Sequence, residues 1–125
     1  MTLQQIADAL VAGCRAGTEM ANLDKLYAPD AVSVEAADMG NGREAAGLEA
    51  IRGKHEWWNS AMEATQTNVS DPMVHGEDRF AVIFEVKGHE KDGGKPFDMK
   101  EVGVYTVANG KITREEFFYQ TSAQA

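Results

Sequence analysis

The fold is decided by residues 97–120, FDMKEVGVYTVANGKITREEFFYQ. Its Asn109-Gly110 pair is the strongest hairpin signal in the chain, because both residues tolerate the positive φ that a tight two-residue turn requires. The pair separates two stretches of alternating character, 97–107 and 112–120. The stretch therefore predicts two long antiparallel strands at the end of the chain.

Working back from this hairpin, the same two-residue alternation predicts further strands. They are a short one at 30–37 and long ones at 65–74 and 79–89. Apolar residues recur at helical spacing earlier in the chain, which predicts helices at 3–17, 19–27 and 47–63. The glycine-rich, charged stretch 38–47 is expected to be a loop.

Helices followed by a run of long strands indicate an α+β fold, with the helices packed on one face of the sheet. At 125 residues the chain fits one domain, 1–125. The strand at 97–107 is apolar on both faces, with Met99 and Tyr105 on one and Val102 and Val104 on the other. A sheet covered by helices on one side should be polar on the other. We therefore expect a homodimer formed through the outer face.

Composition excludes several classes of function. The net charge of −8 disfavours a nucleic-acid partner. Cys14 is the only cysteine and the three histidines are not at ligand spacing, so neither a disulfide nor a metal site is predicted. No phosphate-binding or dinucleotide motif indicates a cofactor. With neither a secretory signal nor an apolar stretch of membrane-spanning length, a cytoplasmic protein without a membrane partner is expected.

Three segments carry a resemblance to a known family. They are Leu23-Asp24-Lys25-Leu26-Tyr27-Ala28-Pro29-Asp30-Ala31-Val32, Gly47-Leu48-Glu49-Ala50-Ile51-Arg52-Gly53-Lys54 and Asn109-Gly110-Lys111-Ile112-Thr113-Arg114-Glu115-Glu116-Phe117-Phe118-Tyr119. In order and spacing the chain resembles the SnoaL-like branch of the nuclear transport factor 2-like superfamily, which includes polyketide cyclases and ketosteroid isomerase. The resemblance implies a cone, in which a strongly curved, mixed but mostly antiparallel sheet wraps over the helices and leaves a pocket.

Three residues are candidates for catalysis. The resemblance places Glu35, by an ungapped match from Asp30, where ketosteroid isomerase has its aspartate base; the alternative is an exposed glutamate at a strand end. His55 shares the inward helix face of Trp58 and could exchange a proton with Glu35, or it could simply be a core histidine. Glu101 has the strand phase of Tyr105 and could donate to an oxyanion, or it could pair with a lysine of a neighbouring strand.

The candidate ligand-binding residues are apolar or aromatic side chains expected on the same inner surface. They are Trp58, Met62, Met99, Tyr105, Phe117 and Tyr119. The first helix has no tyrosine to bind an oxyanion, which departs from ketosteroid isomerase. We expect a cofactor-independent acid–base enzyme acting on a small hydrophobic carbonyl or polyketide-like compound. The alternative is a non-catalytic module of the same fold that binds such a molecule.

Overall fold

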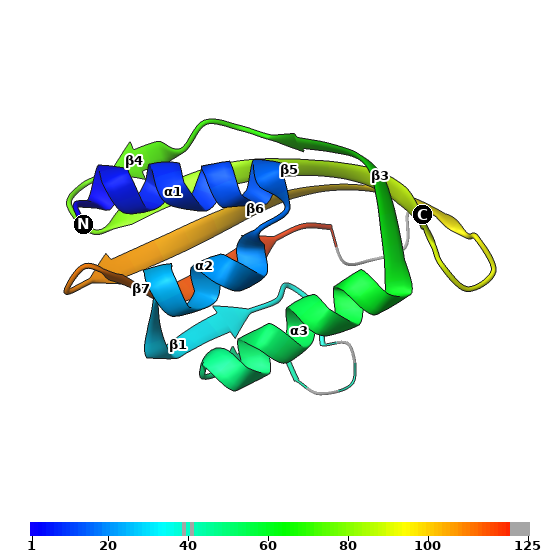
Figure 1. Ribbon diagram of the computed structural model, residues 1–125, viewed down its shortest axis with the longest axis horizontal. Helices are drawn as coiled ribbons and strands as arrows, with labels where there is room; N and C mark the ends of the chain where they lie inside the picture. The colour runs from blue at the N-terminus through cyan, green and yellow to red at the C-terminus, as the bar shows by residue number, and fades with distance from the viewer. Residues whose placement is uncertain (39, 41, 121–125) are drawn as a thin grey trace.

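The computed structural model describes residues 1–38, 40 and 42–120. Within them, three helices lie on one side of a seven-stranded sheet (Figure 1). The helices are α1 (Leu3–Ala16), α2 (Glu19–Leu26) and α3 (Leu48–Ala61). The strands are β1 (Tyr27–Val34), β2 (Glu44–Ala46), β3 (Met62–Val69), β4 (Met73–His75), β5 (Arg79–Glu90), β6 (Pro96–Ala108) and β7 (Lys111–Phe118).

The sheet confirms the predicted mixed, mostly antiparallel α+β architecture. Its strand order is β2-β1-β7-β6-β5-β3, and β4 pairs with β5. The pair of β1 and β7 is parallel and the other pairs are antiparallel. The predicted hairpin at Asn109-Gly110 joins β6 to β7, and Asn109 has the positive φ of 53° that its side chain tolerates. The parallel pair brings the start of the sheet against its last strand.

The first helix has the boundaries its sequence predicts. Thr2 and Gln5 form a reciprocal capping box at its start. Gly17 ends it in the left-handed conformation, which costs glycine nothing. Within the described part of the chain, none of the helices has both the length and the apolarity that a membrane crossing requires.

Several boundaries differ from prediction by one to three residues: the strand expected at 30–37 spans Tyr27–Val34, and the helix expected at 47–63 spans Leu48–Ala61. Tyr27, expected to end a helix, begins β1, and Pro29 lies inside this strand. The ladder of β1 with β7 is irregular between Tyr27 and Val32, so the missing N–H of Pro29 interrupts no regular pairing. The third helix ends at Ala61, and the strand β3 begins at once.

The predicted single strand 65–74 is two strands, β3 and β4. Ser70 separates them: its backbone N–H donates to the carbonyl of Ile83, and its hydroxyl accepts from the N–H of Ile83. Pro72 follows and has no N–H for a ladder. The predicted loop 38–47 contains the short strand β2, which pairs with the end of β1, and Met39 and Asn41 of that loop lie outside the described residues.

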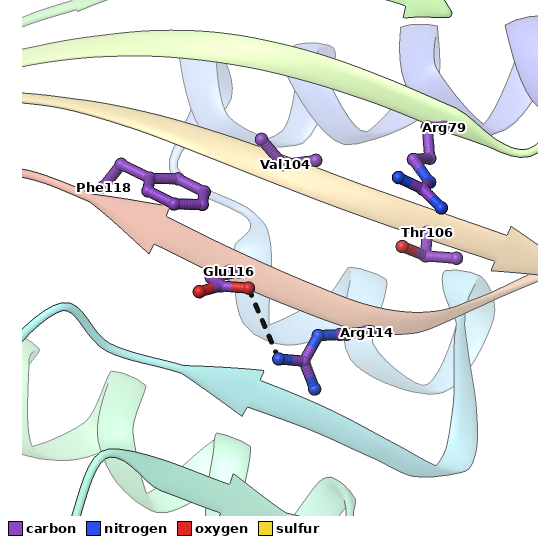
Figure 2. Close-up of a pocket in the computed structure, with 6 residues that line it drawn as sticks. All are labelled: Arg79, Val104, Thr106, Arg114, Glu116 and Phe118. Carbon is purple, nitrogen blue, oxygen red and sulfur yellow. Dashed lines mark hydrogen bonds and ion pairs between the residues drawn. The ribbon is translucent and has the colours of Figure 1, made fainter. Parts of the chain in front are cut away.

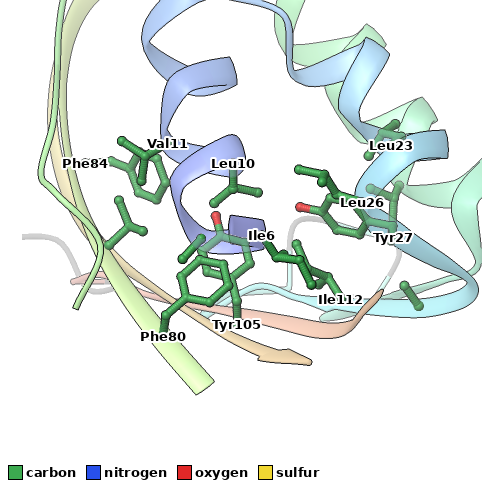
Figure 3. Close-up of a cluster of buried hydrophobic side chains, with 14 residues drawn as sticks. Ile6, Leu10, Val11, Leu23, Leu26, Tyr27, Phe80, Phe84, Tyr105 and Ile112 are labelled. Atoms are coloured by element: carbon green, nitrogen blue, oxygen red, sulfur yellow. The ribbon is translucent and has the colours of Figure 1, made fainter. Parts of the chain in front are cut away.

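The core fills the space between α1, α2 and the inner face of the sheet (Figure 3). Ile6 and Leu26 from the helices meet Phe80 and Ile112 from the strands, and all four are fully buried. Tyr105 stacks on Phe80 with ring centroids 4.8 Å apart. The core thus fixes one face of β5, β6 and β7 as the inner face, and α3 packs beside β1 at its other end.

The outer face of the sheet carries apolar side chains that no helix or strand of the described residues covers. Figure 2 shows Val104 and Phe118 on this face together with the polar side chains of a shallow cleft of about 270 Å³. Phe118 is 50% exposed. Arg114 and Glu116 lie beside these apolar groups and form an ion pair. Charges of both signs beside an apolar centre can complement the same surface of a second copy.

We therefore propose that a second copy covers this face, and we expect sedimentation at micromolar concentration to give twice the 13.6 kDa chain mass. Phe118→Asp should shift the protein to monomer, because it places a carboxylate in a buried apolar contact. Trp57→Asp is the matched control, since Trp57 is equally an exposed aromatic, at 57%, but lies on α3. A native protein that sediments as a monomer would contradict the proposal.

Candidate functional site

A buried carboxylate lies between the parallel strands β1 and β7. Glu115 of β7 is 3% exposed, and it accepts hydrogen bonds from the Tyr27 hydroxyl and from the Ser33 hydroxyl, the latter at 2.7 Å. Burial raises the pKa of Glu115, while the two hydroxyl donors and the nearby Lys54 oppose this rise. Because both carboxylate oxygens accept, the geometry is that of an ionised side chain.

Lys54 of α3 extends this network toward the surface. Its Nζ lies 2.7 Å from Ser33 Oγ and 2.5 Å from Glu35 Oε2. The ammonium also lies 5.5 Å from the centroid of the Phe117 ring, which is within the range of a cation–π contact. Lys54 therefore joins α3 to both β1 and β7.

Glu35 follows directly on β1 and is half-buried. Its backbone is fixed by two hydrogen bonds with Arg43. The Arg43 Nε–H donates to the Glu35 carbonyl, and the Arg43 carbonyl accepts from the Glu35 N–H. Tyr119 donates to Oε1 at 2.9 Å while Lys54 binds Oε2. Burial and this bond to Glu35 raise the pKa of Tyr119 to about 12, so Tyr119 stays a donor at neutral pH. The carboxylate is held in one orientation and retains unoccupied lone pairs.

Glu101 lies on the inner face of β6, as its strand phase predicts, opposite the buried Phe84. Among the described residues its side chain makes neither a hydrogen bond nor an ion pair, so the alternative of a lysine partner is not found. Burial raises its pKa to about 7, and the charges of Glu35 and Glu115 add to the rise against the opposing charge of Lys54. No fully buried side-chain oxygen in the described residues lacks a partner, so both carboxyl oxygens of Glu101 retain solvent contact.

Among the described residues His55 and Glu35 form no hydrogen bond with one another, so the proton exchange between them stays a prediction. The Glu35 oxygens are taken by Lys54 and Tyr119, and within the described residues the His55 ring forms no hydrogen bond. Burial and the neighbouring Lys54 lower the pKa of His55, and Glu35 opposes them. The imidazole is therefore neutral at pH 7. Lys54, the residue before His55, makes the contact with Glu35 that was predicted for His55.

The six predicted ligand-binding residues have different surroundings. Tyr119 and Phe117 adjoin the network, whereas Tyr105, 2% exposed, packs in the core with its ring edge-to-face on Phe117. Trp58 packs edge-on against Phe97 at 5.4 Å between centroids. Met62 and Met99 are half-buried at the start of β3 and within β6.

Two clefts of the described residues differ in lining from the predicted pocket. One cleft lies on the outer face of the sheet (Figure 2). The other, of about 330 Å³, lies at the end of α3 between Trp57, Met62 and Lys91. Neither is lined by Glu35, His55 or Glu101, so convergence on one ligand pocket stays a prediction. Within the described residues, no group of three or more His, Cys, Asp or Glu side chains could hold a metal ion.

Sequence analysis missed four members of the network, although a signal existed for three. Lys54 lies three residues after Ile51 and four before Trp58, so helical spacing places it on their face. Ser33 alternates with Glu35, and Glu115 alternates with Phe117. Charged and hydroxyl residues are normally assigned to the solvent side, which concealed this phase information. Tyr27 gave no signal because it was expected in a helix.

The comparisons with known proteins agree with this fold. The family model of the SnoaL-like domain matches residues 1–119. A solved structure from Mesorhizobium loti, described as a SnoaL-like polyketide cyclase and, in brackets, as a carbohydrate phosphatase, is 38% identical over 95% of this chain and 100% of that one, with a TM-score of 0.87. No protein of curated function matches the chain.

More distant structures share the fold alone. A nuclear transport factor 2-like protein of Burkholderia thailandensis is 22% identical over 96% of this chain and 92% of that one, with a TM-score of 0.76. A protein with the ketosteroid isomerase-like fold from Catenulispora acidiphila, solved in complex with trimethylamine, is 19% identical over 92% and 82%, with a TM-score of 0.65. On the match that spans nearly all of its length, the chain belongs to the SnoaL-like domain family.

Proposed function

We propose that this protein is a cofactor-independent acid–base enzyme that moves a proton next to the carbonyl group of a small hydrophobic compound. The observation that carries the proposal is the inner-face Glu101, whose carboxyl has no partner among the described residues and titrates near pH 7. A carboxyl with such a pKa can hold or release a proton under physiological conditions, which a surface glutamate cannot. It lies in the field of a second, oriented carboxylate, Glu35.

Glu35 is the general base in this proposal. Its hydrogen bonds from Tyr119 and Lys54 fix its direction, and its free lone pairs accept the proton. Removing the proton leaves an enolate, whose negative oxygen needs stabilisation. Protonated Glu101 would donate a hydrogen bond to that oxygen, and the Lys54 ammonium would stabilise its charge.

The surroundings favour an apolar substrate. The rings of Phe117 and Phe84 lie beside the two carboxyl groups, and Trp58 and Phe97 pack together at the other end of α3. Aromatic rings bind apolar ligands by burial of area and give little to strongly hydrated ones. The Mesorhizobium loti relative's description as a polyketide cyclase supports the same substrate class, since polyketides carry several activated carbonyl groups.

A non-catalytic ligand-binding module is the second candidate. It is favoured by one observation, namely that both oxygens of Glu35 already have donors, which leaves fewer lone pairs for an incoming proton. In such a module the same polar groups would orient a bound molecule and no proton would move. The two candidates differ in turnover and agree in binding.

Proton exchange tests the proposal without knowledge of the natural substrate. The protein is incubated in D₂O with 2-indanone, 2-tetralone and acetylacetone, and loss of the α-proton signals is followed by ¹H NMR. Glu35→Gln keeps the side-chain volume but removes the base, so we expect exchange to fall by about 100-fold or more. Ligand-induced shifts in the protein spectrum should persist.

The exposed glutamate of β3 supplies the control, because Glu63→Gln makes the same chemical change away from the site. Binding of these ketones without any exchange above the buffer rate would favour the binding module. Exchange that survives in Glu35→Gln would remove Glu35 from the mechanism.

The raised pKa of Glu101 predicts how the stability of the protein depends on pH. Because the folded-state pKa of Glu101 is about 7, against 4.5 for its model value, the folded protein holds a proton here that the unfolded chain releases. Stability from this group is thus complete below pH 4.5 and is lost as pH rises through 7. The unfolding free energy of Glu101→Gln, relative to that of the native protein, should therefore be higher at pH 8.5 than at pH 5. The expected difference is roughly 2 kcal/mol after discounting for solvent contact.

Two measurements check this expectation. Chemical denaturation at the two pH values gives the difference in unfolding free energy, and ¹³C NMR of the carboxyl groups should show one glutamate titrating near pH 7 that disappears in Glu101→Gln. If all glutamates titrate below pH 5.5, Glu101 cannot be the proton donor. Catalysed exchange should correspondingly decline above pH 7, as Glu101 loses its proton.

A further inference from the structure

The Lys54 ammonium has two hydrogen-bond partners, the half-buried Glu35 and the fully buried Ser33. Toward the surface it meets Glu35 directly, with Nζ 2.5 Å from Oε2. Toward the interior it donates to Ser33 Oγ at 2.7 Å. Since a serine hydroxyl has a single hydrogen, and Ser33 accepts from Lys54, that hydrogen is directed at Glu115 Oε2, which lies 2.7 Å away. A continuous chain of hydrogen bonds thus connects the ammonium to a buried carboxylate.

We propose that Glu115, acting through Ser33, is a second and buried counterion that holds Lys54 in place, so that Glu115 and Ser33 are positioning residues of the site. Glu115 touches neither Glu35 nor Glu101 through any hydrogen bond of the described residues. The chain of hydrogen bonds from Glu115 through Ser33 to Lys54 does not pass through Glu35. Only the catalytic consequence of this hold rests on the proposed function.

That consequence follows from the charges during proton transfer. When Glu35 takes the α-proton of a ketone, the carboxylate becomes a neutral acid and the C–H electron pair moves onto the carbonyl oxygen. Lys54 then loses its surface counterion at the moment when a new anion, the enolate, forms nearby. With Glu115 still ionised below it, the ammonium stays in position, and it now pairs with the enolate oxygen in place of Glu35.

The alternative is that Glu115 is only a satisfied core residue. The Tyr27 hydroxyl donates to its other oxygen, and both strands are tied together by the result. A structural role of this kind predicts that changes at Glu115 alter stability and leave the chemical state of Lys54 unchanged. The chemical state of Lys54 therefore distinguishes the two roles, whereas stability does not.

Competitive acetylation measures that state directly. The folded full-length protein is treated with a trace of acetic anhydride at pH 8, and the extent of labelling of each lysine is read by mass spectrometry. Only the free-base amine reacts, so loss of a counterion speeds labelling. We expect Lys54 to react about threefold to tenfold faster in Ser33→Ala and in Glu115→Gln than in the native protein. Lys87, exposed on β5 and paired with Asp98, serves as the internal reference.

Matched variants control for the substitutions themselves. Ser60→Ala and Glu63→Gln make the same changes at exposed positions, and neither should affect Lys54. Glu35→Gln removes the direct counterion and is the positive control. Ser33→Thr restores the hydroxyl and should return Lys54 labelling to the native rate. If Ser33→Ala fails to fold, the near-isosteric Glu115→Gln carries the same test.

The outcomes separate this inference from the proposed function. Unchanged Lys54 labelling in folded Glu115→Gln overturns the inference, even if the native protein exchanges ketone protons. Faster Lys54 labelling in Ser33→Ala and Glu115→Gln supports the role of Glu115 as a counterion of Lys54, even if no ketone proton is exchanged. Where exchange is catalysed, Glu115→Gln should lower kcat about tenfold and leave KM within twofold, because Lys54 would act on the enolate and not on the bound ketone.

Discussion

The buried carboxylate of Glu115 is the constraint on which the rest of the structure depends. An ionised carboxylate 3% exposed is tolerated only if hydrogen bonds and an opposite charge replace its water. Tyr27 and Ser33 on β1 supply the hydrogen bonds, and Lys54 on α3 supplies the charge. Satisfying this one group therefore requires the parallel pairing of β1 with β7 and fixes α3 against their junction.

Core and candidate site adjoin on the inner face of the sheet. Gly103 is buried on β6, and a Cβ there would lie 3.0–3.1 Å from ring atoms of Tyr105, Phe117 and Phe84. The three rings thus use the space that this glycine leaves. Phe117 in turn lies beneath the Lys54 ammonium. An apolar core at one end of the sheet passes without a break into a charged cluster at the other.

The cluster also accounts for how two glutamates of the site acquire different properties. Glu35 has two donors and is oriented by them, whereas Glu101 has none among the described residues and is governed by burial and by its negative neighbours. Two carboxyl groups in such different environments, one oriented by donors and one with a pKa raised to about 7, suit acid–base chemistry. Membership of the SnoaL-like domain family gives the scaffold, and these side-chain environments carry the argument for a reaction.

The sequence by itself determined the α+β class, the long strands that became β5, β6 and β7, the hairpin at Asn109-Gly110 and the strand face that Glu101 shares with Tyr105. These follow from periodicity and turn chemistry, which act between residues close in the chain. The tertiary structure alone decided which polar groups meet. Glu35 contacts Lys54 and not His55, one position away on the same helix, because the contact depends on the rotation of α3 against β1. Likewise Glu115 lies 82 residues from Ser33 in the chain. No local pattern records a pairing that only the parallel register of β1 and β7 creates, so the network could not be predicted before the strands were placed.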